Sequence, residues 1–246
     1  MMLTFDPPVI AHRGMSANAP ENTMAAFTRV VQAGIQWVEF DVMLAACGTP
    51  VVIHDETLER TTGHAGSVGD FPYSYLSTLD AGGWFQSAFS GERIPAFAQV
   101  MEFLADTKLC ANIEIKPLPL QEERTVVQAL QVLKTHFPEN SPSLLFSSFS
   151  HATLHELRKH APTCQLGLLM HAWQPDWREF ASALNCVSVH VNQEILTATR
   201  AAEIKTDNKI LLSYTVNDVD RAEALFASGV DAVFSDCPDR IARFGR

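Results

Sequence analysis

The sequence predicts an α/β fold, and within that class a closed (β/α)8 TIM barrel with a small insertion subdomain after an early strand. Short runs rich in Val, Ile and Leu alternate with longer segments of helical periodicity, as in parallel strands joined by crossover helices. Eight or nine candidate strands in 246 residues suit such a barrel. Polar residues come late in many different strands, which favours the barrel over an open doubly wound sheet with one switch point.

The candidate strands share short apolar runs bounded by turn-forming residues. They are residues 8–12, 37–44, 50–54, 111–116, 144–149, 165–170, 186–191, 210–216 and 231–236. Helical patterns lie between most of them. In the first, which follows Pro20, Asn22 is the expected N-cap and Gly34 the expected stop.

One segment, about 55–95, interrupts the alternation. It is rich in Gly, Ser, Thr and aromatic residues and has little helix or strand periodicity. A long irregular stretch is usually functional or disordered, and the aromatic content argues against disorder. We therefore expect a single domain over residues 1–246, with this insertion folded over one face of the barrel.

Composition excludes several function classes. The formal net charge of −10 and the lack of any Lys/Arg run argue against nucleic acid as a partner. Five widely spaced cysteines without a C-x-x-C pair are typical of reduced thiols. The chain start has no basic n-region with a long apolar stretch, and no run approaches the roughly 18 apolar residues of a membrane helix. We expect a cytoplasmic protein without a stable membrane anchor.

Three carboxylates share the polar faces of two strands. Side chains alternate across a strand, so Glu39 and Asp41 point to one side of 37–44, and Glu114 and Lys116 point to one side of 111–116. These faces are either simply hydrated or hold a cation, because unpaired carboxylates inside a barrel are costly. All-oxygen ligation indicates a hard divalent cation, Mg²⁺ or Ca²⁺.

Two histidines end candidate strands at the same relative place. His12 ends 8–12 and His54 ends 50–54, and Arg13 directly follows the first. Imidazole, with an unperturbed pKa of about 6.5, suits proton transfer at neutral pH. A guanidinium offers a fork for a phosphate or a carboxylate. Together with a cation, these groups indicate phosphodiester cleavage.

An ordered set of motifs covers nearly the whole chain and makes the prediction specific. The motifs are AHRG…PENT, VEFDV, PVVIHDETLERTTGHAG, GERIP, NIEIK and YTVND…GVDAVFSD. In this order they resemble the glycerophosphodiester phosphodiesterase family. The resemblance implies a (β/α)8 barrel with a small inserted subdomain. It also implies hydrolysis of small glycerophosphodiesters to sn-glycerol 3-phosphate and an alcohol.

The resemblance also implies roles for single residues. Glu39, Asp41 and Glu114 match the ligands of one divalent cation, and His12 and His54 match the general acid and base. Arg13 matches a phosphate contact, and Lys116 lies close to it on the metal-facing side. Which histidine is the acid stays open, as does the choice between water and the glycerol 2-hydroxyl as nucleophile.

Two other functions compete with this one. A lysophospholipase D-type hydrolase would favour an apolar docking surface or an anchor, and the sequence has no evident one. A catalytically inactive barrel that acts as a binding module would be expected to lose a histidine or a carboxylate. Here both histidines and all three carboxylates are present.

Overall fold

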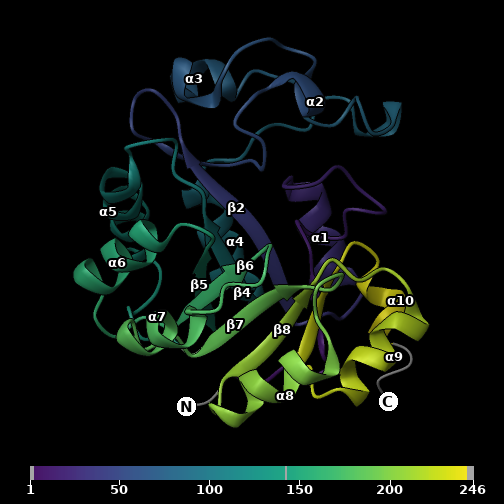
Figure 1. Cartoon of the computed structure of the whole chain (residues 1–246). Coiled ribbons are helices and arrows are strands. Elements are labelled where there is room, and N and C mark those ends of the chain that lie inside the picture. Colours follow the sequence, from purple (N-terminus) through teal and green to yellow (C-terminus); the bar gives the residue numbers. More distant parts are fainter. Residues whose placement is uncertain (1–2, 142, 243–246) are drawn as a thin grey trace.

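A closed barrel organises the chain (Figure 1). The computed structural model describes residues 3–141 and 143–242. Its strand order is β1-β9-β8-β7-β6-β5-β4-β2-β3, and a β1–β2 pairing closes the ring. Every neighbouring pair is parallel except β2 with β3. The prediction of a (β/α)8 barrel is confirmed.

The strands follow the predicted segments to within a few residues. They are β1 (Val9–Ala11), β2 (Trp37–Leu44), β3 (Pro50–Val52), β4 (Cys110–Ile115), β5 (Leu144–Ser148), β6 (Leu166–Met170), β7 (Ser188–Asn192), β8 (Ile210–Tyr214) and β9 (Ala232–Ser235). The helices are α1 (Met24–Gln32), α2 (Glu59–Thr62), α3 (Tyr73–Leu76), α4 (Phe97–Thr107), α5 (Glu122–Leu133), α6 (His151–His160), α7 (Trp177–Ala183), α8 (Ala198–Thr206), α9 (Val219–Ala227) and α10 (Pro238–Ala242).

The segment ending at His54 differs from the expectation, because β3 is not a strand of the barrel. It pairs antiparallel with the end of β2, with Val52 opposite Val42. After β2 the chain therefore turns and runs back along the end of β2 as β3. Directly after β3, the amide of Ile53 donates to the carbonyl of Asp41 at 3.1 Å. His54 reaches the carboxylates through this return, and not because it ends a strand equivalent to β1.

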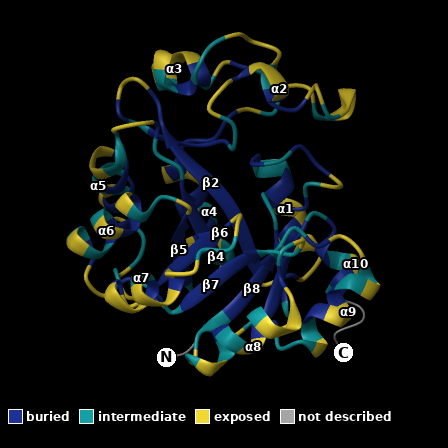
Figure 2. Cartoon of the chain, in the orientation of Figure 1, coloured by how far each residue is buried: buried dark blue, intermediate teal, exposed yellow. Residues whose placement is uncertain are grey.

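Both faces of β2 are buried (Figure 2), and the alternation of its side chains divides them between different apolar clusters. One face of β2 places Val38, Phe40 and Val42 in the main hydrophobic core, where Phe40 contacts Phe27 of α1. The other face starts with Trp37, which belongs to a separate apolar cluster. Each fully buried large apolar side chain stabilises the fold by about 1.5–3 kcal/mol. Within the described residues, no helix is long and apolar enough to span a bilayer.

The first helix begins one residue later than predicted. Thr23 is the N-cap of α1, and its hydroxyl accepts from the amide of Ala26. Asn22, the expected cap, has a positive φ of 56° and donates through its side chain to Asp41 at 2.9 Å instead. The PENT motif therefore both starts the helix and contacts the carboxylate cluster.

The insertion has a small core of its own. Between β3 and α4 it forms α2, α3 and two short 3-10 turns, and it lies above β2 in the view of Figure 1. Leu58, Val68 and Leu76 are fully buried and pack in one cluster with Met43 and Val51 from β2 and β3. Because β2 and its antiparallel neighbour β3 complete this core, the insertion packs directly on the strand that carries Glu39 and Asp41.

Candidate active site

A cavity of about 320 Å³ is lined by residues from several strands and the loops that follow them. Predicted site residues contribute one part of the lining, namely His12, Arg13, Glu39, His54 and Glu114. Another part is largely apolar and comes from Phe149, Leu169, His171, Tyr214, Thr215 and Phe234. Lys116 lines an adjoining cavity that shares Glu114 and Phe149 with the first. The site thus combines ionisable groups with an apolar wall.

The strand register brings the three carboxylates together. Asp41 of β2 lies directly opposite Glu114 of β4, and Glu39 lies opposite Asn112. All four side chains are buried. One oxygen from each of Glu39, Asp41 and Glu114 lies within 4.8 Å of the others. The alternation predicted from the sequence therefore places the carboxylates on one face of two paired strands.

These carboxylates carry unequal charge in the protein alone. Burial, together with the charges of Asp41 and Glu114, raises the pKa of Glu39 well above its ordinary value. Burial and the charge of Asp41 raise the pKa of Glu114 to about 8. Burial also works to raise the pKa of Asp41, but Lys116 and Arg13 hold it below its ordinary value. At neutral pH the cluster therefore lacks enough positive charge nearby to keep all three carboxylates ionised.

A divalent cation fits this cluster. The Oε1 atom of Glu114 is buried and has no hydrogen-bond partner within the described residues. A buried carboxylate oxygen without a partner is costly, and a cation would satisfy it. Three carboxylates offer the oxygen ligands that Mg²⁺ and Ca²⁺ prefer.

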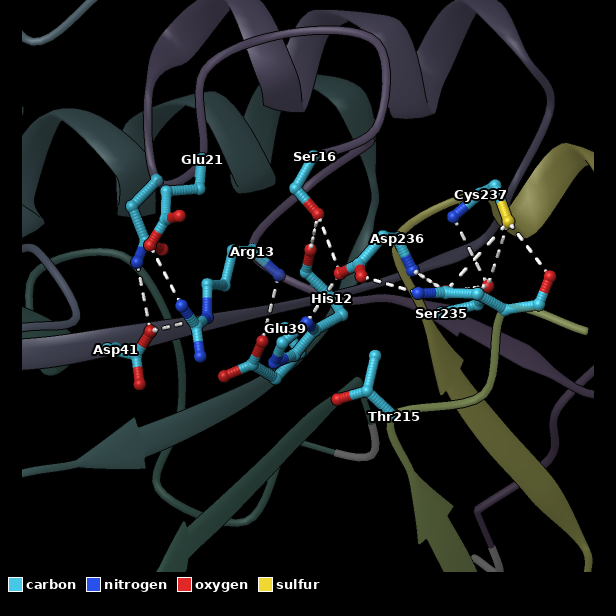
Figure 3. A network of polar contacts seen from close by, with 12 residues as sticks. His12, Arg13, Ser16, Glu21, Glu39, Asp41, Thr215, Ser235, Asp236 and Cys237 are labelled. Carbon is cyan, nitrogen blue, oxygen red and sulfur yellow. Dashed lines mark hydrogen bonds and ion pairs between the residues drawn. The ribbon is translucent and has the colours of Figure 1, made fainter. Parts of the chain in front are cut away.

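A carboxylate orients the imidazole of His12. The Nδ1 atom of His12 lies 2.7 Å from Oδ1 of Asp236, which follows β9. Ser16 donates to the same oxygen at 2.8 Å and Asn217 donates to the other at 2.7 Å (Figure 3). Although burial works to raise it, these hydrogen bonds hold the pKa of Asp236 at about 2. An ionised Asp236 only accepts, so Nδ1 carries a proton and Nε2 is the atom left for the substrate.

His54 is oriented in the same way by its neighbour. Its Nδ1 atom lies 2.6 Å from Oδ1 of Asp55, and the pKa of Asp55 is held far below its ordinary value by the side chain of Arg60, with a smaller contribution from His54. Burial lowers the pKa of His54 itself. At neutral pH the ring is therefore an uncharged imidazole that carries its proton on Nδ1.

The two positively charged side chains of the site, Arg13 and Lys116, both lie close to its carboxylates. Arg13 donates through Nη1 to Glu21 at 2.8 Å, and its Nε atom lies 3.7 Å from Asp41 (Figure 3). Its backbone amide donates to Glu39 at 2.9 Å. Burial disfavours the charge of Arg13, but Asp41 and Glu21 hold its pKa above the ordinary value. Lys116 Nζ lies 3.7 Å from the other oxygen of Asp41.

Comparison with known proteins is consistent with this geometry. A model of the glycerophosphoryl diester phosphodiesterase family matches residues 12–240. A glycerophosphodiester phosphodiesterase from Caldanaerobacter subterraneus is 36% identical over 247 residues, with 97% of both chains covered. The chain belongs to this family.

Solved structures agree with the assignment. A phosphodiesterase from Oleispira antarctica, solved in complex with the product sn-glycerol-3-phosphate, superimposes with a TM-score of 0.93 and 38% identity and covers 96% of both chains. A glycerophosphodiester phosphodiesterase from Bacillus altitudinis is 32% identical over 246 residues, which is 96% of both chains. This member of the family is therefore an enzyme of the glycerophosphodiester phosphodiesterase class.

Sequence reasoning missed two features of the enzyme's site. Asp236 ends the last sequence motif, and because the barrel is closed, a carboxylate after the last strand lies beside the first strand. His171, which belongs to none of the sequence motifs, also lines the cavity. Its only signal is its place directly after β6. The buried His190, by contrast, does not line the cavity itself. It contacts Ser188 at 2.9 Å and packs against Phe234.

Proposed function

We propose that the chain hydrolyses small glycerophosphodiesters to sn-glycerol 3-phosphate and an alcohol, with one divalent cation and two histidines. One observation carries the proposal: a single cavity is lined by two carboxylate-anchored histidines and by carboxylates of a buried, charge-deficient cluster. The relative from Oleispira antarctica, which holds the product sn-glycerol-3-phosphate, supports the choice of substrate.

The cation would be held by Glu39, Asp41 and Glu114. When bound, Mg²⁺ or Ca²⁺ supplies positive charge for the non-bridging phosphate oxygens. Arg13 and Lys116 would add charge beside Asp41 and hold the phosphate. Arg13 is already braced by Glu21, so its guanidinium enters the reaction in a fixed orientation.

The histidines would move the protons. One Nε2 atom takes the proton of the nucleophile, either water or the glycerol 2-hydroxyl, as its oxygen forms a bond to phosphorus. With the 2-hydroxyl the product is a cyclic phosphate, which water then opens to glycerol phosphate. The other histidine, which must carry a proton on both ring nitrogens, gives its Nε2 proton to the oxygen of the departing alcohol as the P–O bond breaks. Asp236 and Asp55 hold the two rings with Nε2 free for these transfers. The apolar wall with Phe149, Leu169 and Tyr214 would limit the access of bulk water.

The test is release of glycerol 3-phosphate from glycerophosphocholine, glycerophosphoethanolamine and glycerophosphoglycerol, with and without chelator. We expect turnover that excess EDTA abolishes and that added Mg²⁺ or Ca²⁺ restores. Full activity in excess EDTA would exclude the cation. No release from any of the substrates with either metal would support the inactive binding module.

A further inference from the structure

Arg60 of the insertion lies between two carboxylates from different parts of the chain. Its Nη1 and Nη2 atoms donate to the two oxygens of Glu21 at 2.6 and 2.8 Å. Its Nε and Nη2 atoms donate to the two oxygens of Asp55 at 2.6 and 3.1 Å. The guanidinium also lies 5.9 Å from the ring centre of Trp84. One planar group thus forms two bidentate contacts, which only an arginine can supply.

The two carboxylates differ in what they do. Glu21 belongs to the PENT motif, and its Oε1 atom, to which Arg60 donates, also accepts from Arg13 at 2.8 Å. Asp55 holds Nδ1 of His54 at 2.6 Å. Glu21 is therefore held in place, and Arg60 links it to Asp55, the carboxylate that orients His54. Asp55 immediately follows His54 in a loop, where backbone geometry alone leaves its carboxylate free to rotate.

We propose that Arg60 is a positioning residue that fixes the imidazole of His54 by tying Asp55 to Glu21. It reaches His54 through Asp55, and it reaches Arg13 through Glu21. The side chain of Arg60 is 43% exposed, so its ion pairs contribute little to global stability. Their value is geometric, because a displacement of about 1 Å in a proton-transfer group costs up to about 100-fold in rate.

This inference rests on the proposed function, since it assumes that His54 transfers a proton. The first test compares Arg60→Lys with Arg93→Lys, using kcat and KM for glycerophosphocholine. Lysine keeps the charge of Arg60 but cannot form two forks. Arg93 is the matched control, because it is the other arginine of the insertion and donates to the backbone of Thr78 at 2.6 Å.

We expect Arg60→Lys to lower kcat about tenfold with KM changed less than about twofold. Arg93→Lys should leave both constants near the wild-type values. In a His54→Ala background the effect of Arg60→Lys should largely disappear, because the residue that it positions is absent. An equal tenfold loss in that background, or wild-type kcat in the single variant, would overturn the inference.

A second measurement does not depend on activity. Long-range ¹H–¹⁵N spectra of the imidazoles report which ring nitrogen carries the proton. Wild-type His54 should show the Nδ1–H form, whereas Arg60→Lys should show a mixture of tautomers and Arg93→Lys should not. An unchanged tautomer in Arg60→Lys overturns the positioning role. If Arg60→Lys changes the tautomer of His54 as expected while the wild-type protein cleaves no glycerophosphodiester, that result would contradict the proposed function but not the positioning role of Arg60.

Discussion

His12 and Asp236 stand 224 positions apart in the sequence, yet His12 Nδ1 lies 2.7 Å from Asp236 Oδ1. The contact follows from closure of the barrel. The strand β1 pairs with β9 so that Ala11 lies opposite Ser235, and the next residue of each strand is the histidine or the aspartate. The pairing of β1 with β9 therefore brings the proposed catalytic histidine and its carboxylate partner together.

Replacement of Asp236 by asparagine tests this unit. We expect Asp236→Asn to lower kcat by about 10²–10⁴-fold, because an amide can pair with the wrong tautomer of His12. Release of glycerol 3-phosphate measures the effect. Ser16→Ala is the control, since it removes one hydrogen bond to the same carboxylate and should cost less than about tenfold. Near wild-type turnover of Asp236→Asn would show that His12 needs no carboxylate partner.

The two histidines themselves give the next prediction. His12→Ala and His54→Ala should each lower kcat by about 10²–10⁴-fold, the usual contribution of general acid–base catalysis. Cation affinity and thermal stability should change little, because neither ring belongs to the carboxylate cluster. His64→Ala, which alters an exposed histidine of the insertion, is the matched control. If either active-site variant keeps its turnover, the assignment of the pair is wrong.

The raised carboxyl pKa values predict how pH acts on the chelated protein. Glu114 titrates at about 8 in the folded chain against an ordinary value of 4.5, and the pKa of Glu39 is also raised. These groups bind more protons in the folded state than in the unfolded state, whereas the lowered pKa values of His190 and His54 have the opposite effect below pH 6.5. The free energy of unfolding should therefore fall as pH rises from about 6.5 towards 8. Urea unfolding in EDTA at several pH values measures this fall.

A bound divalent cation should reverse that trend. The variant Glu114→Gln tests whether the pH dependence and the response to metal both come from the carboxylate cluster. Saturating Mg²⁺ or Ca²⁺ should stabilise the protein more at pH 8 than at pH 5, because it replaces protons on the cluster. Glu114→Gln should flatten the pH dependence and weaken the response to metal. A wild-type stability that rises steadily over this range in EDTA would contradict the assignment.

Substrate size gives the last prediction. The cavity of about 320 Å³ falls in the range of small-molecule sites. We expect kcat/KM for glycerophosphocholine in solution to exceed that for long-chain lysophosphatidylcholine in micelles by at least about tenfold. Measuring choline release from both substrates in the same detergent controls for inhibition. Faster cleavage of the lysolipid would favour the lysophospholipase D function.

The local sequence pattern was enough to predict the strands and helices of the barrel and the shared face of the three carboxylates. The alternation of 37–44 and 111–116 placed Glu39, Asp41 and Glu114 on shared faces, because side-chain direction in a strand depends only on neighbouring residues. The alternation of strands and helices predicted the barrel, because the pattern of each element can be identified within a short window of sequence. These signals are local, and the structure keeps them.

The sequence by itself determined the fold class, the carboxylate faces and the motif residues. Tertiary structure decided which of them meet. The closure of β1 on β9 and the bridge from Arg60 to Glu21 join segments distant in the chain, and the antiparallel return of β3 brings His54 back to the barrel. Such contacts depend on strand register and on which strands become neighbours, and these are set by packing of the whole barrel rather than by the residues on either side.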